Sequence, residues 1–79
     1  MMLLTLYSRE YCHLCHEMLA ALEKSRHDFR LEIVDVDEDE TLEARYGELV
    51  PVLAGEGGKE ICHYHLDEAA LDAYFEAAE

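Results

Sequence analysis

Two cysteines separated by two residues are the side chains best suited to chemistry in this sequence. They form Cys-His-Leu-Cys at positions 12–15, directly after a short apolar segment and at the start of a helical pattern. Residues three apart at a helix start lie on one side, close enough to form a disulfide. The helix dipole and free N–H groups there lower the pKa of the first thiol. Thiolate is the nucleophile of disulfide exchange, so we assign Cys12 as nucleophile and Cys15 as resolving thiol.

Charged neighbours modify the reactivity of this pair. Arg9 and His13 place positive charge near Cys12, whereas Glu10 and Glu17 oppose it. Nearby charges outweigh remote exposed ones, because salt screens long-range interactions. We therefore expect the pKa of Cys12 to be depressed, with Arg9 supporting the thiolate.

Hydrophobic periodicity predicts the elements that position these residues. Strands are expected at 2–7, 29–36, 50–54 and 59–62, with a turn at 55–58. Helices are expected at 12–26, from the acids at 37–40 through Tyr46, and from Asp67 onward. Asp37 and Glu40 have the spacing of a capping box for the short middle helix. Lys24 and Arg26 would favour the dipole at the end of the first helix.

The order of these elements predicts one α/β domain spanning residues 1–79. The first two strands are joined through a helix, so they should be parallel with a right-handed crossover. The last two strands form an antiparallel hairpin. The expected fold is a mixed four-stranded sheet flanked by three helices, in the order β-α-β-α-β-β-α.

Residues 4–15 resemble the start of a glutaredoxin, including a basic residue, Arg9, three positions before the first cysteine. Val50-Pro51 resembles the Val-Pro of that family, and the match in element order covers nearly the whole chain. The resemblance is closest to short bacterial glutaredoxin-like proteins and implies a thioredoxin-like fold. It also implies that Pro51 is cis and that the backbone of Val50 pairs with a bound peptide or glutathione. We assign Arg9, His13, Val50 and Pro51 to substrate binding.

Three stretches depart from the glutaredoxin pattern. His13-Leu14 stands where Pro-Tyr is usual, and Leu49 replaces the Thr before Val-Pro. Cys62-His63 occupies the stretch where a Gly-Gly pair usually helps to hold glutathione. The redox fold is therefore better supported than the use of glutathione.

Other interpretations of the cysteines stay open. Cys-His-Leu-Cys-His matches a haem-attachment motif, but no export signal accompanies it and the framework wraps no haem. A zinc site is a stronger alternative. The resemblance also implies that two such molecules could share an iron–sulfur cluster, but this usually needs glutathione as co-ligand, which the missing Gly-Gly disfavours. The zinc ligands would be Cys12, Cys15 and His16 with Cys62, His63 or His65. A redox-inert domain that binds proteins is a third alternative. Cys62 is expected to be a buried structural residue rather than a third redox partner.

The net charge of −13 argues against nucleic acid and anionic membranes as partners. The acidic run at 37–40 suits helix capping better than a calcium loop, because its spacing differs from an EF-hand.

Without a basic start and a long apolar segment, no signal peptide is recognised. We therefore expect a cytoplasmic monomer. It would have no built-in cofactor and no metal, with glutathione as a possible co-substrate. Its partners would be a disulfide-containing protein and either glutathione or a flavin-dependent reductase as electron donor.

Overall fold

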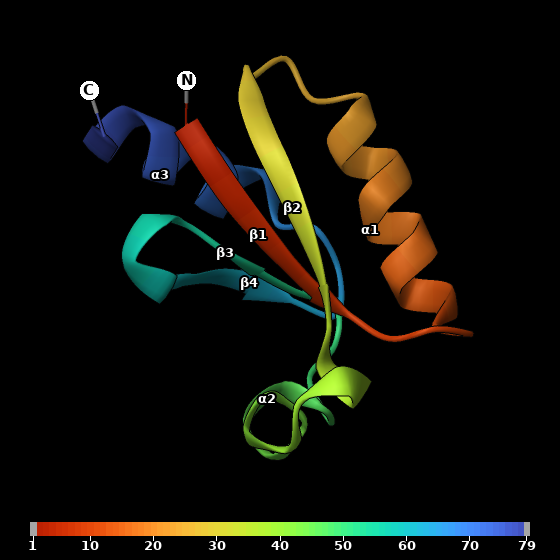
Figure 1. The fold of residues 1–79 in the computed structure, drawn as a ribbon. Helices are drawn as coiled ribbons and strands as arrows, with labels where there is room; N and C mark the ends of the chain where they lie inside the picture. The colour runs from red at the N-terminus through yellow and green to blue at the C-terminus, as the bar shows by residue number, and fades with distance from the viewer. Residues whose placement is uncertain (1, 79) are drawn as a thin grey trace.

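The computed structural model describes residues 2–78, which form a four-stranded sheet and three helices (Figure 1). The elements follow one another as β1 (Met2–Ser8), α1 (His13–Glu23), β2 (Phe29–Asp35), α2 (Glu40–Tyr46), β3 (Val52–Ala54), β4 (Glu60–His63) and α3 (Glu68–Ala78). One-turn 3-10 segments lie at Val36–Glu38 (η1) and Glu56–Gly58 (η2). This order confirms the predicted β-α-β-α-β-β-α arrangement.

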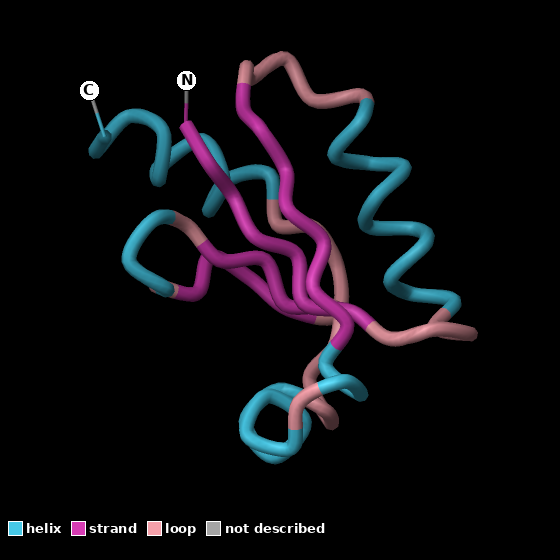
Figure 2. The backbone as a smooth tube through the Cα atoms, in the orientation of Figure 1, coloured by secondary structure: helices cyan, strands magenta, loops and turns pink. Residues whose placement is uncertain are grey.

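The sheet is mixed, with strand order β2-β1-β3-β4 (Figure 2). β1 and β2 are parallel, so that Ser8 aligns with Asp35 at their carboxyl ends. β3 runs antiparallel to β1, which aligns Val52 with Tyr7, and β4 runs antiparallel to β3. The ends of β1 and β2, the start of β3 and the end of β4 therefore meet at one end of the sheet.

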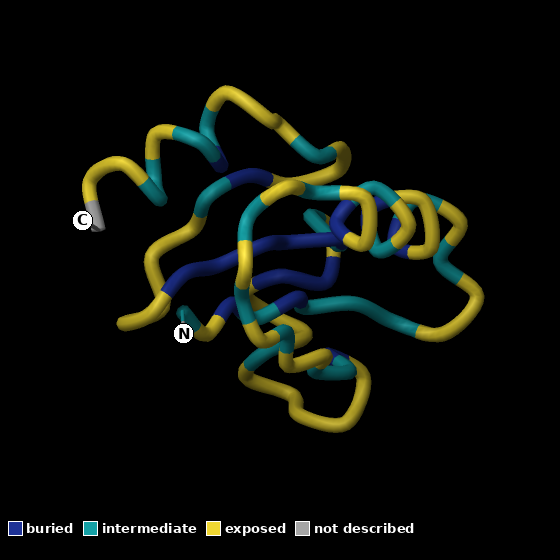
Figure 3. Tube along the Cα trace, turned by 90° about the horizontal axis from the view of Figure 1, so that it is seen from above, coloured by how far each residue is buried: buried dark blue, intermediate teal, exposed yellow. Residues whose placement is uncertain are grey.

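Two apolar clusters lie on opposite faces of this sheet, because successive strand residues point to opposite sides. The larger cluster joins α1 and α3 to one face and contains Leu4, Leu6, Met18, Leu22, Leu53, Cys62 and Leu71. The smaller cluster packs α2 against the other face and contains Val36, Tyr46 and Val52. Figure 3 shows the buried stretches concentrated in the central strands, with exposed segments around them. α1 thus covers one face of the sheet, and α2 packs on the other face near the end where β1 leads into the cysteine pair.

Several boundaries differ from the sequence-based expectation. α1 ends at Glu23, because Ser25 begins a turn in which its Oγ accepts the N–H of His27 at 3.2 Å. Arg26 therefore lies outside the helix, and Lys24 is its C-cap. Val50 and Pro51 precede β3 instead of beginning it.

The predicted capping box at Asp37 and Glu40 is wrong. The N-cap of α2 is Asp39, whose Oδ1 accepts the N–H groups of Thr41 at 2.8 Å and Leu42 at 3.3 Å. Asp37 lies instead in η1, which Asp35 caps. No helix within residues 2–78 is long and apolar enough to cross a membrane.

Candidate active site

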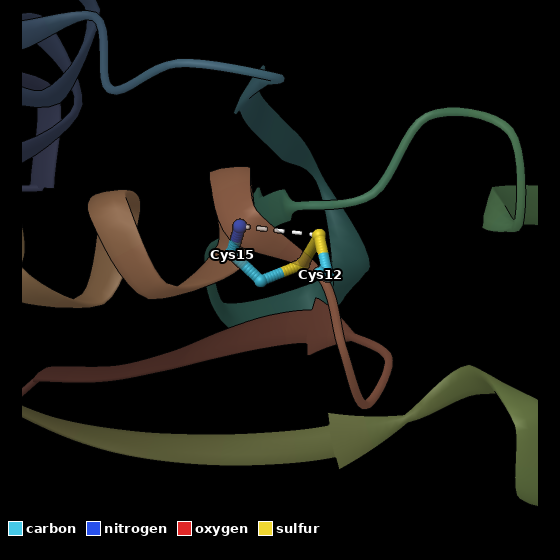
Figure 4. The surroundings of a disulfide bond; sticks show 2 residues. All are labelled: Cys12 and Cys15. Atoms are coloured by element: carbon cyan, nitrogen blue, oxygen red, sulfur yellow. Dashed lines mark hydrogen bonds between the residues drawn. A yellow bond between two sulfur atoms is a disulfide. The ribbon is translucent and has the colours of Figure 1, made fainter.

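Cys12 is the N-cap of α1, and Cys15 lies in the first turn of that helix (Figure 4). The two form a disulfide with their Cα atoms 5.2 Å apart. The Cys12 Sγ also accepts a hydrogen bond from the backbone N–H of Cys15 at 3.1 Å. Cys12 is half-buried, whereas Cys15 is only 3% exposed. An attacking group therefore reaches the sulfur of Cys12 more readily than that of Cys15.

Arg9 links the loop before Cys12 to the acidic segment around α2. Its Nη2 lies 3.0 Å from a carboxylate oxygen of Asp37 and 3.6 Å from one of Glu43. The side chains of all three are between 33% and 55% exposed, so solvent weakens these ion pairs. The charge of Arg9 offsets two carboxylates close to the cysteine loop. Its support for the Cys12 thiolate remains a prediction.

Val50-Pro51 lies beside the cysteine loop, because the next residue, Val52, pairs with Tyr7 at the end of β1. The peptide bond between Val50 and Pro51 is cis, as the glutaredoxin resemblance implied. The N–H of Val50 donates to the carbonyl of Tyr46 at 3.0 Å. The amide of Val50 is therefore already used within the protein, and the pairing of Val50 with a substrate remains a prediction.

Tyr64 borders the same segment and was not identified from the sequence. Its N–H donates to the carbonyl of Pro51 at 2.9 Å, and its hydroxyl donates to the carbonyl of Glu48 at 3.2 Å. Its φ of 66° lies in the left-handed region, which non-glycine residues rarely adopt. Nothing in the residue pattern after β4 indicates that this tyrosine reaches back to the Pro51 segment.

Tyr11 and His13 flank Cys12 and face solvent. The side chain of His13 is 88% exposed, and its Nε2 lies 3.0 Å from a carboxylate oxygen of Glu17, one turn later. Tyr11 is 96% exposed and has a φ of 61°. Both are accessible to a partner that approaches Cys12, and the assignment of His13 to substrate binding remains a prediction.

Cys62 is a buried, free thiol in β4, in agreement with its predicted structural role. Burial raises the pKa of this thiol, which disfavours its reactive thiolate. A depression of about 730 Å³ borders Cys62, His63 and His65, and its lining does not include Cys12 or Cys15. Among residues 2–78, no group of three or more Cys, His, Asp or Glu side chains is arranged to hold a metal ion. The structure therefore does not assemble the Cys/His ligand set of the zinc alternative.

Solved structures of two bacterial proteins are similar to this chain over nearly its full length. Protein Ne2328 from Nitrosomonas europaea is 42% identical, with a TM-score of 0.78 over 92% of this chain and 89% of that chain. The X-ray structure of target protein XcR50 from X. campestris is 39% identical, with a TM-score of 0.79. That match covers 96% of this chain and 99% of that chain. The solution structure of XcR50 gives a TM-score of 0.73 over 96% of this chain and 95% of that chain, at 40% identity.

No curated protein matches this sequence. The model of one family, described as a glutaredoxin-like domain (DUF836), matches residues 3–76 and thus covers both cysteines and the cis-proline segment. The fold agrees with this match, since it combines a thioredoxin-like mixed sheet with a Cys-x-x-Cys pair at a helix start. The chain therefore belongs to the glutaredoxin-like domain family.

Proposed function

We propose that this protein is a dithiol thiol–disulfide oxidoreductase that reduces disulfides in proteins or mixed disulfides with glutathione. One observation carries the proposal: Cys12 and Cys15 form a disulfide at the start of α1, with Cys12 the more accessible. Membership of the glutaredoxin-like family supports a redox role for such a pair.

The reduced protein would act in two exchange steps. The Cys12 thiolate attacks one sulfur of the substrate disulfide, forms a mixed disulfide and releases the other sulfur as a thiolate. The Cys15 thiol, after losing its proton to solvent, attacks the Cys12 sulfur and releases the second substrate thiolate. Two electrons pass to the substrate, and the Cys12–Cys15 disulfide forms. A thiol reductant, glutathione or a flavin-dependent reductase with its carrier, then restores both thiols.

The surroundings of Cys12 support the first step. The N–H of Cys15 points at the Cys12 sulfur, and α1 begins there, so both favour negative charge on that sulfur. Arg9 offsets the carboxylates of Asp37 and Glu43, which would otherwise disfavour the thiolate. Val50 offers a backbone carbonyl to an extended substrate segment beside Pro51.

A trapping experiment tests the assignment of the two cysteines. In a Cys15→Ser variant, the first step proceeds but the resolving thiol is missing, so a mixed disulfide with a disulfide-bonded peptide should accumulate. Non-reducing mass spectrometry would detect it at Cys12. The Cys12→Ser variant should form no adduct, and Cys62→Ala in the trapping background should leave the adduct unchanged. Trapping at Cys15 or Cys62, or no trapping at all, would contradict the mechanism.

Redox titration tests the function independently. Oxidation of the purified protein in thiol–disulfide buffers should be a reversible two-electron transition at Cys12–Cys15, followed by mass. Midpoints of related dithiol proteins span roughly −270 to −120 mV. Absence of any transition across that range would contradict an oxidoreductase function.

A further inference from the structure

Negative charge is concentrated at the end of the molecule that carries Cys12. Segments 8–17 and 35–50 meet there, because Ser8 aligns with Asp35 and Tyr7 aligns with Val52. Together these 26 residues contain nine carboxylates and two arginines, a formal charge of −7 out of the total of −13. The carboxylates are Glu10, Glu17, Asp35, Asp37, Glu38, Asp39, Glu40, Glu43 and Glu48. Figure 1 shows α2 next to this end of the sheet.

The two arginines at this end offset only part of its negative charge. Arg9 pairs with Asp37 and Glu43, and the guanidinium of Arg45 lies 5.1 Å from the centre of the Tyr46 ring. The remaining lysines and arginines lie toward the other end of the strands. Lys24 and Arg26 follow α1, Arg30 lies early in β2, and Lys59 directly precedes β4. An anionic substrate at Cys12 would therefore meet a field that is negative even with both arginines counted.

The backbone of residues 49–51, beside the cysteine loop, offers no amide donor. The amides of Leu49 and Val50 both donate to the carbonyl of Tyr46, at 2.8 and 3.0 Å, and Pro51 has no N–H. Residues 49–51 thus offer no free amide hydrogen to the carboxylate of a substrate. This observation is independent of the side-chain charges and disfavours a substrate that brings a carboxylate to this segment.

We propose that the substrate of this site is a polypeptide disulfide flanked by lysine or arginine side chains, and that anionic disulfides react poorly. This inference rests on the proposed thiol–disulfide exchange at Cys12. A negative field raises the local concentration of cationic partners and speeds their encounter. Ammonium and guanidinium groups would donate to the exposed carboxylates around the cysteine loop.

Small disulfides of different charge provide the test. The reduced full-length protein is mixed with cystamine (cationic), bis(2-hydroxyethyl) disulfide (neutral) or dithiodiglycolate (anionic), and formation of the Cys12–Cys15 disulfide is timed. Each rate is divided by that of dithiothreitol with the same probe, which removes differences in intrinsic reactivity. At low salt we expect cationic, neutral and anionic probes to rank in that order, with roughly a tenfold spread that shrinks as salt is added.

A charge-reversal pair localises the effect. Glu10→Lys changes an exposed residue two positions before Cys12 and should reduce the spread about two- to threefold. Glu23→Lys makes the same charge change at the far end of α1 and should leave the spread nearly intact. Equal normalised rates, a faster anionic probe, or equal effects of the two variants would overturn the inference while leaving the proposed function in place. No reaction with any probe, the neutral one included, would overturn the proposed function and the inference with it.

Discussion

The two cysteines of the motif differ in environment although they are only three residues apart. Cys12 is the N-cap of α1 and receives the N–H of Cys15 on its sulfur, whereas Cys15 packs into the buried side of the helix. A cap position has non-helical backbone and projects its side chain toward the free amides of the first turn. The same geometry that bonds the disulfide sulfur would stabilise a thiolate after reduction. The assignment of Cys12 as nucleophile thus has a physical basis in the cap itself.

Arg9 provides the residue-scale prediction. Replacing it by Gln leaves Asp37 and Glu43 without their partner, so the field at Cys12 becomes more negative and the pKa of its thiol should rise. The pKa is measured from thiolate absorbance against pH in the Cys15→Ser, Cys62→Ala background. Arg45→Gln removes the same charge from α2 but leaves the Arg9 ion pairs intact, and its effect should be smaller. An unchanged pKa in the Arg9→Gln variant would show that the arginine only connects the loop to α2.

At the scale of elements, the start of α2 provides a second prediction. Asp39→Ala removes the acceptor of the Thr41 and Leu42 amides, so the free energy of unfolding should fall by about 1 kcal/mol. Asp37→Ala removes only a partly exposed ion pair with Arg9 and should cost roughly 0–1 kcal/mol. Urea denaturation of both variants measures the difference. A larger loss for Asp37→Ala would mean that its link to Arg9 stabilises the fold more than the cap does.

Most elements were predictable because each has its own local pattern. Alternation and apolar runs located all four strands, and the periodicity of Leu14, Met18 and Leu22 located α1. The cap of α2 was misplaced because four consecutive acids offer several suitable spacings, and only the path of the chain selects Asp39. Local sequence identifies that a helix begins in such a run but not at which acid.

The cysteine pair and cis-Pro51 were accessible from sequence because they are motifs, whereas their contacts depend on distant segments. The pairing of Arg9 with Asp37 and Glu43 joins residues about 30 positions apart. Tyr64 reaches the carbonyl of Glu48 across 16 positions. Such contacts arise only when the register of the sheet brings β1, β3 and β4 to one end. For this reason the sequence predicts that the backbone of Val50 is available to a substrate. In the structure the amide of Val50 already donates to the carbonyl of Tyr46.

At the scale of the whole molecule, the end opposite the cysteines is closed by contacts between segments far apart in the chain. His27, in the loop between α1 and β2, stacks on Phe75 of α3 with ring centroids 4.3 Å apart. Its Nε2 lies 2.6 Å from a carboxylate oxygen of Asp72, and Arg26 lies 3.4 Å from the other oxygen. α3 is thereby tied to the crossover that makes β1 and β2 parallel. A carboxylate therefore joins the apolar core in the contacts of α3 with the rest of the molecule.

Acid should weaken this attachment, which gives the last prediction. The hydrogen bond from His27, assisted by the charge of Arg26, lowers the pKa of Asp72 below its usual 3.8. A carboxyl group with a depressed pKa in the folded state stabilises the fold above its unfolded pKa, and this stabilisation is lost as pH falls through the folded pKa. Urea midpoints measured from pH 7 down to about 2 should therefore drop more steeply below about pH 4 for the wild type than for Asp72→Asn. Glu76→Gln, an exposed change on the same helix, is the control and should keep the wild-type slope. Parallel curves for the wild type and Asp72→Asn would show that the His27–Asp72 contact does not hold α3 in solution.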